Sequence, residues 1–166
     1  MRNLDQYQII FCDIDDTLIY GFWTNLMKHS WNLFRCNLLS DILMKLQYKF
    51  KLYKVNQKLR YMLVNSSAPV VFLTARKHVP ETEYMLSEIL EDEGLEEYFE
   101  VRHLATDNPA EDKYNEIVKY IQDYLEMDVE LTKICLFDDN DDVRKLVATL
   151  EVDTFDPTVL FQESVR

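Results

Sequence analysis

Three carboxylates follow the first apolar run of the chain at close spacing. Residues 9–12 have the continuous hydrophobicity of a strand buried on both faces, and Asp13, Asp15 and Asp16 come after it. Acidic side chains this close together repel each other unless a cation compensates their charge. A divalent ion such as Mg²⁺, bound beside a phosphate group, is the usual solution in proteins. The cluster therefore predicts an enzyme rather than a structural element.

Three further signals appear in order along the chain. Thr74 follows a second apolar run and precedes Arg76, Lys113 lies in the first turn of a predicted helix, and an acidic run at 138–142 follows another apolar run. A threonine hydroxyl can bind phosphoryl oxygens, and a lysine ammonium can neutralise a phosphate or a carboxylate. Strands that end in acids would deliver them to one edge of a parallel sheet, where such sheets bind ligands.

Together the four signals resemble the haloacid dehalogenase (HAD) superfamily of phosphohydrolases and phosphotransferases. The pattern of that family is an Asp-x-Asp-x-Thr/Val strand end, a later strand-end Thr or Ser, a Lys, and an acidic pair after another strand; here it spans roughly 13–142. The resemblance implies a Mg²⁺-dependent phosphatase that hydrolyses a phosphate monoester through an aspartyl-phosphate. It makes Asp13 the nucleophile and a metal ligand.

The same resemblance assigns roles to other residues. Asp15 would ligate the metal through its backbone carbonyl, and its side chain would protonate the leaving oxygen and later take a proton from water. Thr74 and Lys113 would bind the phosphoryl group. Arg76 is a further candidate for substrate binding, with pairing to a structural acid as its alternative.

The acidic run leaves a choice of metal ligands. Asp139 is the first choice beside Asp13, but Asp138 stands where the family more often has Gly, so Asp138 and Asp142 are alternatives. An Asp-Asp pair at this point is similar to polynucleotide 3′-phosphatases. It adds weight to a nucleotide or nucleic-acid end as the substrate.

Ordinary structural roles compete with chemistry at several positions. Asp16 and Thr17 could form a turn or a helix cap. Thr74 could be a plain cap, and Lys119 would replace Lys113 if the alignment were shifted. The chain's histidines have no metal-ligand spacing, and we assign them no catalytic role: His29, His78 and His103.

Alternating strand and helix signals predict an α/β, Rossmann-like three-layer sandwich with a central parallel sheet, formed by a single domain at 1–166. Strands are expected at 7–14, 70–73, 99–103, 133–137 and 152–155. Helices are expected at 81–93, 110–125 and 142–150.

The segment at 22–64 is longer than a crossover helix needs, and we expect a predominantly helical, basic, cap-like insertion. Residues 21–60 hold eight Lys or Arg and one Asp, in a chain whose net charge is −12. Lysines there alternate with aromatic residues, a pattern that suits nucleic-acid contact: Lys45, Tyr48, Lys49, Phe50, Lys51 and Tyr53. The alternatives are an outer helix face that only solubilises the chain, and adsorption to an anionic membrane surface. Self-association through Trp23 and Trp31 is compatible with each.

The composition, 48% hydrophobic and 29% charged, is that of a soluble globular protein. No uncharged apolar run is long enough to span a bilayer. Cys12, Cys36 and Cys135 have no metal-ligand spacing, so we expect buried thiols in a reducing compartment, the cytoplasm.

Three other functions fit the same sequence. A phosphotransferase would keep the covalent intermediate and pass the phosphoryl group to a sugar-like acceptor. A catalytically silent binding module would act through the basic helices. A membrane-associated lipid phosphatase is a third reading of the basic segment.

Overall fold

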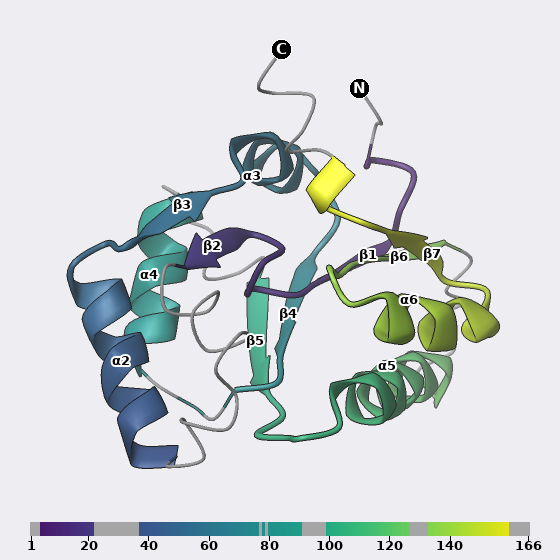
Figure 1. The fold of residues 1–166 in the computed structure, drawn as a ribbon. Helices are drawn as coiled ribbons and strands as arrows, with labels where there is room; N and C mark the ends of the chain where they lie inside the picture. Colours follow the sequence, from purple (N-terminus) through teal and green to yellow (C-terminus); the bar gives the residue numbers. More distant parts are fainter. Residues whose placement is uncertain are drawn as a thin grey trace.

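Parallel strands form the centre of the protein in the computed structural model, which describes residues 4–21, 37–76, 78, 80–90, 99–126 and 133–159 (Figure 1). The sheet has five strands in the order β5-β4-β1-β6-β7. Their bounds are β1 (Ile9–Cys12), β4 (Val70–Thr74), β5 (Phe99–His103), β6 (Ile134–Phe137) and β7 (Asp153–Phe155). All five lie within the ranges predicted from the sequence, except that β4 extends one residue further. The predicted fold class, α/β with a central parallel sheet of Rossmann-like type, is thereby confirmed.

The strand order places a topological switch at the middle of the sheet. From β1 the chain builds outward through β4 to β5, then returns to the other side of β1 and builds outward through β6 to β7. Ligands of open α/β sheets bind at the carboxyl ends of the strands that flank such a switch. Here these strands are β1 and β6, and both end in aspartates.

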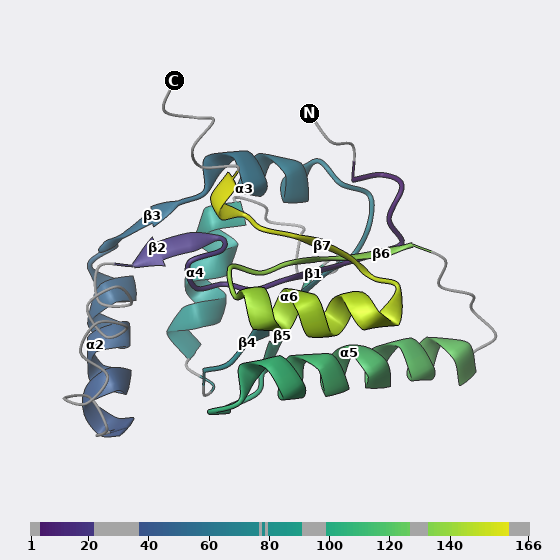
Figure 2. The same cartoon turned by 45° about the vertical axis from the view of Figure 1, so that its right-hand side comes forward.

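Helices cover both faces of the sheet, so the fold has three layers (Figure 2). Ile10 and Cys12 of β1 pack in a core with helices from one face, and Ile9 and Phe11 pack in a core with helices from the other. This alternation is what a strand buried on both faces requires. The first core includes α3 (Gln57–Val64) and α4 (Pro80–Leu90), and the second includes α5 (Pro109–Glu126) and α6 (Asp141–Val147).

The three predicted helices that follow β4 are present with small differences at their ends. Helix α6 begins after Asn140, whose side chain accepts the backbone N–H of Asp142. It continues as a 3₁₀ turn, η2 (Ala148–Leu150), and the chain then reverses at Glu151, which has a left-handed φ of 62°. Helix α5 begins at Pro109, so Lys113 falls just beyond its first turn rather than within it.

The segment between β1 and β4 contains a two-stranded antiparallel sheet that the sequence did not predict. Helices α2 (Asn37–Lys49) and α3 are helical as expected, but β3 (Tyr53–Val55) pairs antiparallel with β2 (Ile19–Gly21). These strands have three residues each, too few for an alternating pattern to stand out from the helical periodicity around them. The part of the predicted helical segment at 22–36 lies outside the described residues, as do Trp23, Trp31 and Cys36.

Gly21 lets β2 and α2 approach closely. A Cβ atom at this position would collide with the side-chain amide of Gln47, which is fully buried. A larger residue here would have to displace the buried Gln47 side chain. Of the described helices, none is long and apolar enough to cross a membrane.

Candidate active site

Asp13 and Asp138 directly follow the ends of the neighbouring strands β1 and β6, at equivalent positions in the register. The register of β1 and β6 pairs Cys12 with Phe137, and the Asp13 N–H donates to the Phe137 carbonyl at 2.8 Å. Only 6% of Asp13 and 1% of Asp138 is exposed. Two carboxylates are therefore held side by side, away from water, at the switch in strand order.

Lys113 reaches these carboxylates from α5. Its Nζ donates to Asp13 Oδ1 and to Asp138 Oδ2, both at 2.7 Å, and the residue is buried. Lys113 shares the inward face of α5 with the buried Ile117, four residues later, because residues four apart lie on one helix face. Lys119, the alternative lysine, is exposed. Although burial opposes its ionisation, the two carboxylates raise the pKa of Lys113, which stays charged.

One ammonium cannot compensate two buried carboxylates fully. Burial, followed by repulsion from Asp13, raises the pKa of Asp138 to about 7, against the opposing attraction of Lys113. The site therefore keeps an excess of negative charge that a further cation would neutralise.

Asp13, Asp138 and Asp139 form a group in which one carboxylate oxygen from each residue lies within 4.8 Å of the other two. Oxygen donors of this kind are those that Mg²⁺ prefers, so the donor set fits the expected ion. Both oxygens of Asp138 already accept hydrogen bonds, Oδ2 from Lys113 and Oδ1 from the Asn140 N–H at 2.9 Å. This favours Asp139 as the second ligand beside Asp13. Asp142 lies exposed at the start of α6 and does not belong to the group.

Asp15 and Arg76 form an ion pair at the rim of this cluster. The Arg76 guanidinium donates to Asp15 Oδ1 and to the hydroxyl of Tyr48, and it also lies 5.6 Å from the centre of the Tyr48 ring. Arg76 therefore pairs with the candidate general acid of the first motif rather than with a purely structural acid, and substrate binding by Arg76 stays a prediction. Burial raises the pKa of Asp15 to about 7, although Arg76 lowers it and Asp13 adds to the rise. Both protonation states of Asp15 are accessible near neutral pH.

Two threonines stabilise the loops around the carboxylates. Thr17 is buried, and its hydroxyl accepts the backbone N–H of Asp139 at 3.0 Å, which joins the first motif to the last. Residues 16–18 form a turn in which Asp16 adopts a left-handed φ of 58°, so the turn prediction is confirmed. The sequence did not predict the hydrogen bond between Thr17 and Asp139. Thr74 ends β4 fully buried, and its Oγ1 accepts the Arg76 N–H at 3.3 Å.

The basic insertion differs from the predicted aromatic surface in one respect. Tyr48 is buried against Arg76 and cannot stack on a base, because α2 packs this side of its helix inward. Lys45 and Lys49 are exposed and line a groove of about 660 Å³ between α2 and α4, together with apolar side chains such as the exposed Tyr84. Lys51 also lines it and pairs with Glu88 at 3.0 Å.

Two of the histidines, which are far apart in the sequence, come together in the fold. His78 and His103 lie beside each other with Glu83 close by. Sequence spacing could not reveal this cluster, since its members lie on a loop, a helix and a strand end. Pairing of β4 with β5 brings the ends of these strands together, and a prediction of this pairing would have been needed to find the cluster.

Comparisons with known protein families, with curated proteins and with solved structures found no match. The function of the protein is therefore inferred from its residues and their geometry.

Proposed function

We propose that the protein is a Mg²⁺-dependent phosphatase of the HAD type, which hydrolyses a phosphate monoester through an aspartyl-phosphate at Asp13. The observation that carries the proposal is the buried contact of Lys113 with Asp13 and Asp138, 2.7 Å each, at the switch between β1 and β6. Burying two carboxylates beside a lysine costs free energy, and it brings a nucleophile and a compensating cation to the ligand-binding edge. The buried free thiols of Cys12 and Cys135 support a reducing, cytoplasmic location.

In this mechanism a carboxylate oxygen of Asp13 attacks phosphorus and the bond to the ester oxygen breaks. Neutral Asp15 gives its proton to the departing alkoxide, and the resulting carboxylate then takes a proton from the water that hydrolyses the aspartyl-phosphate. Lys113 holds Asp13 in place and stabilises charge on the phosphoryl oxygens, and the Thr74 hydroxyl donates to one of them. The pKa of Asp15, about 7, suits a group that must act first as an acid and then as a base.

Asp13 and Asp139 would hold the Mg²⁺ ion, with the backbone carbonyl of Asp15. When bound, Mg²⁺ neutralises the repulsion between the nucleophile and a phosphate dianion. The substrate class we propose is a nucleotide or a nucleic-acid end, because the groove carrying Lys45 and Lys49 presents charge and apolar surface together. Tyr48, which contacts the groove and Arg76, links that groove to the rim of the site.

The test is phosphate release from a panel of esters, in Mg²⁺ and in EDTA. The panel contains mononucleotides, 3′- and 5′-phosphorylated oligonucleotides, sugar phosphates and an aryl phosphate. Release that needs Mg²⁺ and is lost in Asp13→Asn, with an unchanged far-UV circular dichroism spectrum, is the expected result. Retained activity in Asp13→Asn would refute the mechanism.

A second measurement separates hydrolysis from the other functions. An acid-quenched reaction should contain phosphate bound to the protein in a hydroxylamine-sensitive bond, absent from Asp13→Asn. Formation of that bond with release only in the presence of a sugar would identify the phosphotransferase. Salt-sensitive oligonucleotide binding without turnover of any ester would identify the silent binding module.

A further inference from the structure

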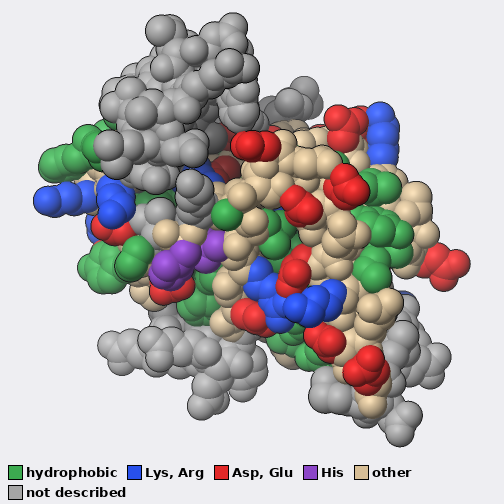
Figure 3. All heavy atoms as spheres, turned by 90° about the horizontal axis from the view of Figure 1, so that it is seen from below, with side chains coloured by type: hydrophobic (Ala, Val, Ile, Leu, Met, Phe, Trp, Pro, Cys, Tyr) green, Lys and Arg blue, Asp and Glu red, His purple; other side chains and the backbone are tan. Residues whose placement is uncertain are grey.

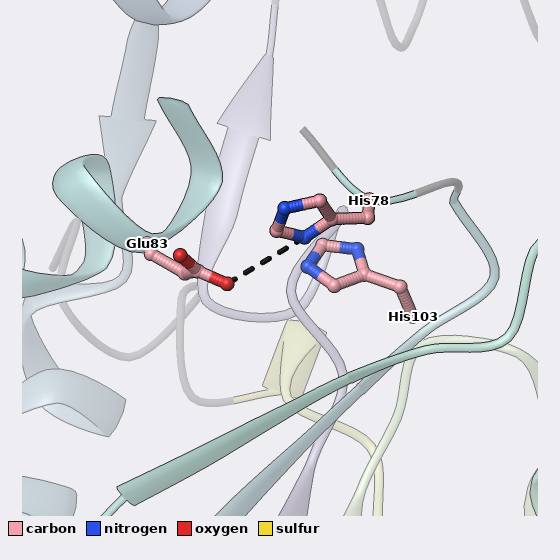
Figure 4. Close-up of side chains that lie close together, drawn as sticks. All are labelled: His78, Glu83 and His103. Atoms are coloured by element: carbon pink, nitrogen blue, oxygen red, sulfur yellow. Dashed lines mark ion pairs between the residues drawn. The ribbon is translucent and has the colours of Figure 1, made fainter. Parts of the chain in front are cut away.

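His78, Glu83 and His103 meet at the carboxyl edge of the sheet, outside the residues assigned to the reaction. His103 ends β5, Glu83 lies in the first turn of α4, and His78 precedes that helix. Figure 4 shows the three side chains facing one another. The Nδ1 atom of His78 is 3.6 Å from Glu83 Oε1, and the two imidazole rings lie edge to face with centres 5.0 Å apart.

We propose that these three residues bind Zn²⁺. Each offers one ligand atom, and the three atoms lie within 4.8 Å of one another. Two imidazole nitrogens and one carboxylate oxygen are a donor set that Zn²⁺ favours and Mg²⁺ does not, whereas the oxygen-only group around Asp13 has the opposite preference. Three protein ligands leave a fourth tetrahedral position for water or another ligand.

The distances suit a tetrahedral ion after small side-chain rotations. Zinc–ligand bonds of roughly 2.0–2.1 Å place tetrahedral ligand atoms about 3.3–3.4 Å apart. The 3.6 Å between His78 and Glu83 already approaches this value, and their side chains are 59% and 52% exposed, so they can rotate without disturbing the core. In Figure 3 the described histidine side chains appear at the surface, but both ring nitrogens of His103 are buried, so an ion would enter from the side of His78 and Glu83.

The backbone holds the two histidine-bearing segments together. The Leu104 N–H donates to the Thr74 carbonyl at 2.9 Å, and the Ala105 N–H donates to the Arg76 carbonyl at 3.2 Å. The segment after β5 is therefore fastened to the segment after β4. An exposed His–Glu ion pair alone would stabilise little and would not require a second imidazole. Binding of an ion accounts for all three side chains.

The position of the site suggests what the ion would do. The register of β4 and β5 pairs Thr74 with His103, so the zinc ligand on β5 neighbours the residue proposed to bind phosphate. A bound ion would join the end of β5 to α4 and to the connection that carries Arg76. We therefore expect Zn²⁺ to stabilise the fold and to order this side of the active site.

The test is Zn²⁺ binding to the chelator-treated full chain, measured by competition with a chromophoric chelator in excess Mg²⁺. One equivalent of Zn²⁺ should bind and raise the melting temperature, and Co²⁺ should give the visible absorption of a four-coordinate site with nitrogen ligands. His78→Ala and His103→Asn should each weaken binding by about 100-fold or more, and Glu83→Gln by about 10-fold. His29→Ala, which removes the remaining histidine, and Asp13→Asn should bind as the wild type does.

Folding controls separate a loss of zinc ligands from a loss of structure. Unchanged circular dichroism without metal shows that a variant has folded, and the surface position of His78 makes His78→Ala the safer of the histidine variants. The proposal is overturned if no Zn²⁺ binds, if the ion is lost in Asp13→Asn but kept in His78→Ala, or if His29→Ala has the same effect as His78→Ala. Zinc binding does not depend on turnover, so it can succeed or fail independently of the proposed phosphatase activity.

Discussion

Replacing Lys113 by Met tests whether one buried ammonium holds the two carboxylates together. Met keeps the length and the apolar stem of the side chain and removes its charge. At 2.7 Å and an effective dielectric constant of about 20, each contact with Asp13 and Asp138 is worth about 6 kcal/mol of Coulomb attraction, before the cost of desolvating the charges. Breaking a buried pair on one side costs about 3–5 kcal/mol, since a charge is left uncompensated.

We therefore expect Lys113→Met to lower the free energy of unfolding by about 3–5 kcal/mol in EDTA at pH 8. The loss should be smaller at pH 5.5, because Asp138, whose pKa is already raised to about 7, can take a proton there. Urea unfolding followed by far-UV circular dichroism measures both values. Mg²⁺ should restore part of the lost stability, since it supplies the missing positive charge.

Two matched variants make this prediction specific. Lys119→Met changes an exposed lysine of the same helix and should alter stability by less than about 0.5 kcal/mol. The double variant Lys113→Met/Asp138→Asn removes one of the two repelling carboxylates and should be more stable than Lys113→Met alone. The reasoning is refuted if Lys113→Met loses no more than Lys119→Met, or if the double variant is no better than the single one.

Two further predictions concern the same cluster. In EDTA, Asp138 should make the free energy of unfolding fall as the pH rises from about 4 to about 7, because the folded state keeps a proton on Asp138 that the unfolded state releases near the ordinary pKa of 3.8. Urea unfolding should show that the free energy of unfolding depends less steeply on pH in Asp138→Asn than in the wild type. An equal dependence on pH in both proteins would contradict the raised pKa. Thr17→Val keeps the shape of the side chain but removes the acceptor of the Asp139 N–H. We therefore expect the free energy of unfolding to fall by about 1 kcal/mol and the Mg²⁺ affinity, measured by calorimetry, to be weaker. The control Thr149→Val, a substitution at an exposed position, should leave the Mg²⁺ affinity unchanged.

The layout of the strands could be predicted because burial on both faces imposes a continuous apolar run. Three of the five sheet strands, β1, β4 and β6, are such runs, whereas the edge strands β5 and β7 mix polar and apolar residues. The acids at 13 and 138 mark where β1 and β6 end. Parallel strands bring their carboxyl ends to one edge, so the approach of Asp13 and Asp138 followed from the order of the elements. The choice between Lys113 and Lys119 depended on which lysine lies on the inward face of α5, and only the structure showed this.

Other features depended on contacts that no local pattern encodes. The antiparallel pair of β2 and β3 joins segments more than 30 residues apart, and each strand is too short to be recognised alone. The inward position of Tyr48 depends on Arg76, which is 28 residues away. The meeting of His78 with His103 depends on the pairing of β4 with β5.

The sequence by itself determined the α/β class, the sheet strands and the residues that end them, since periodicity and burial act over a few neighbouring residues. Only the tertiary structure decided which charges meet: Lys113 with Asp13 and Asp138, Arg76 with Asp15, and His78 with Glu83 and His103. The reason is physical. Electrostatic and ligand contacts depend on distances of a few ångströms between side chains, and those distances are set by how whole strands and helices pack.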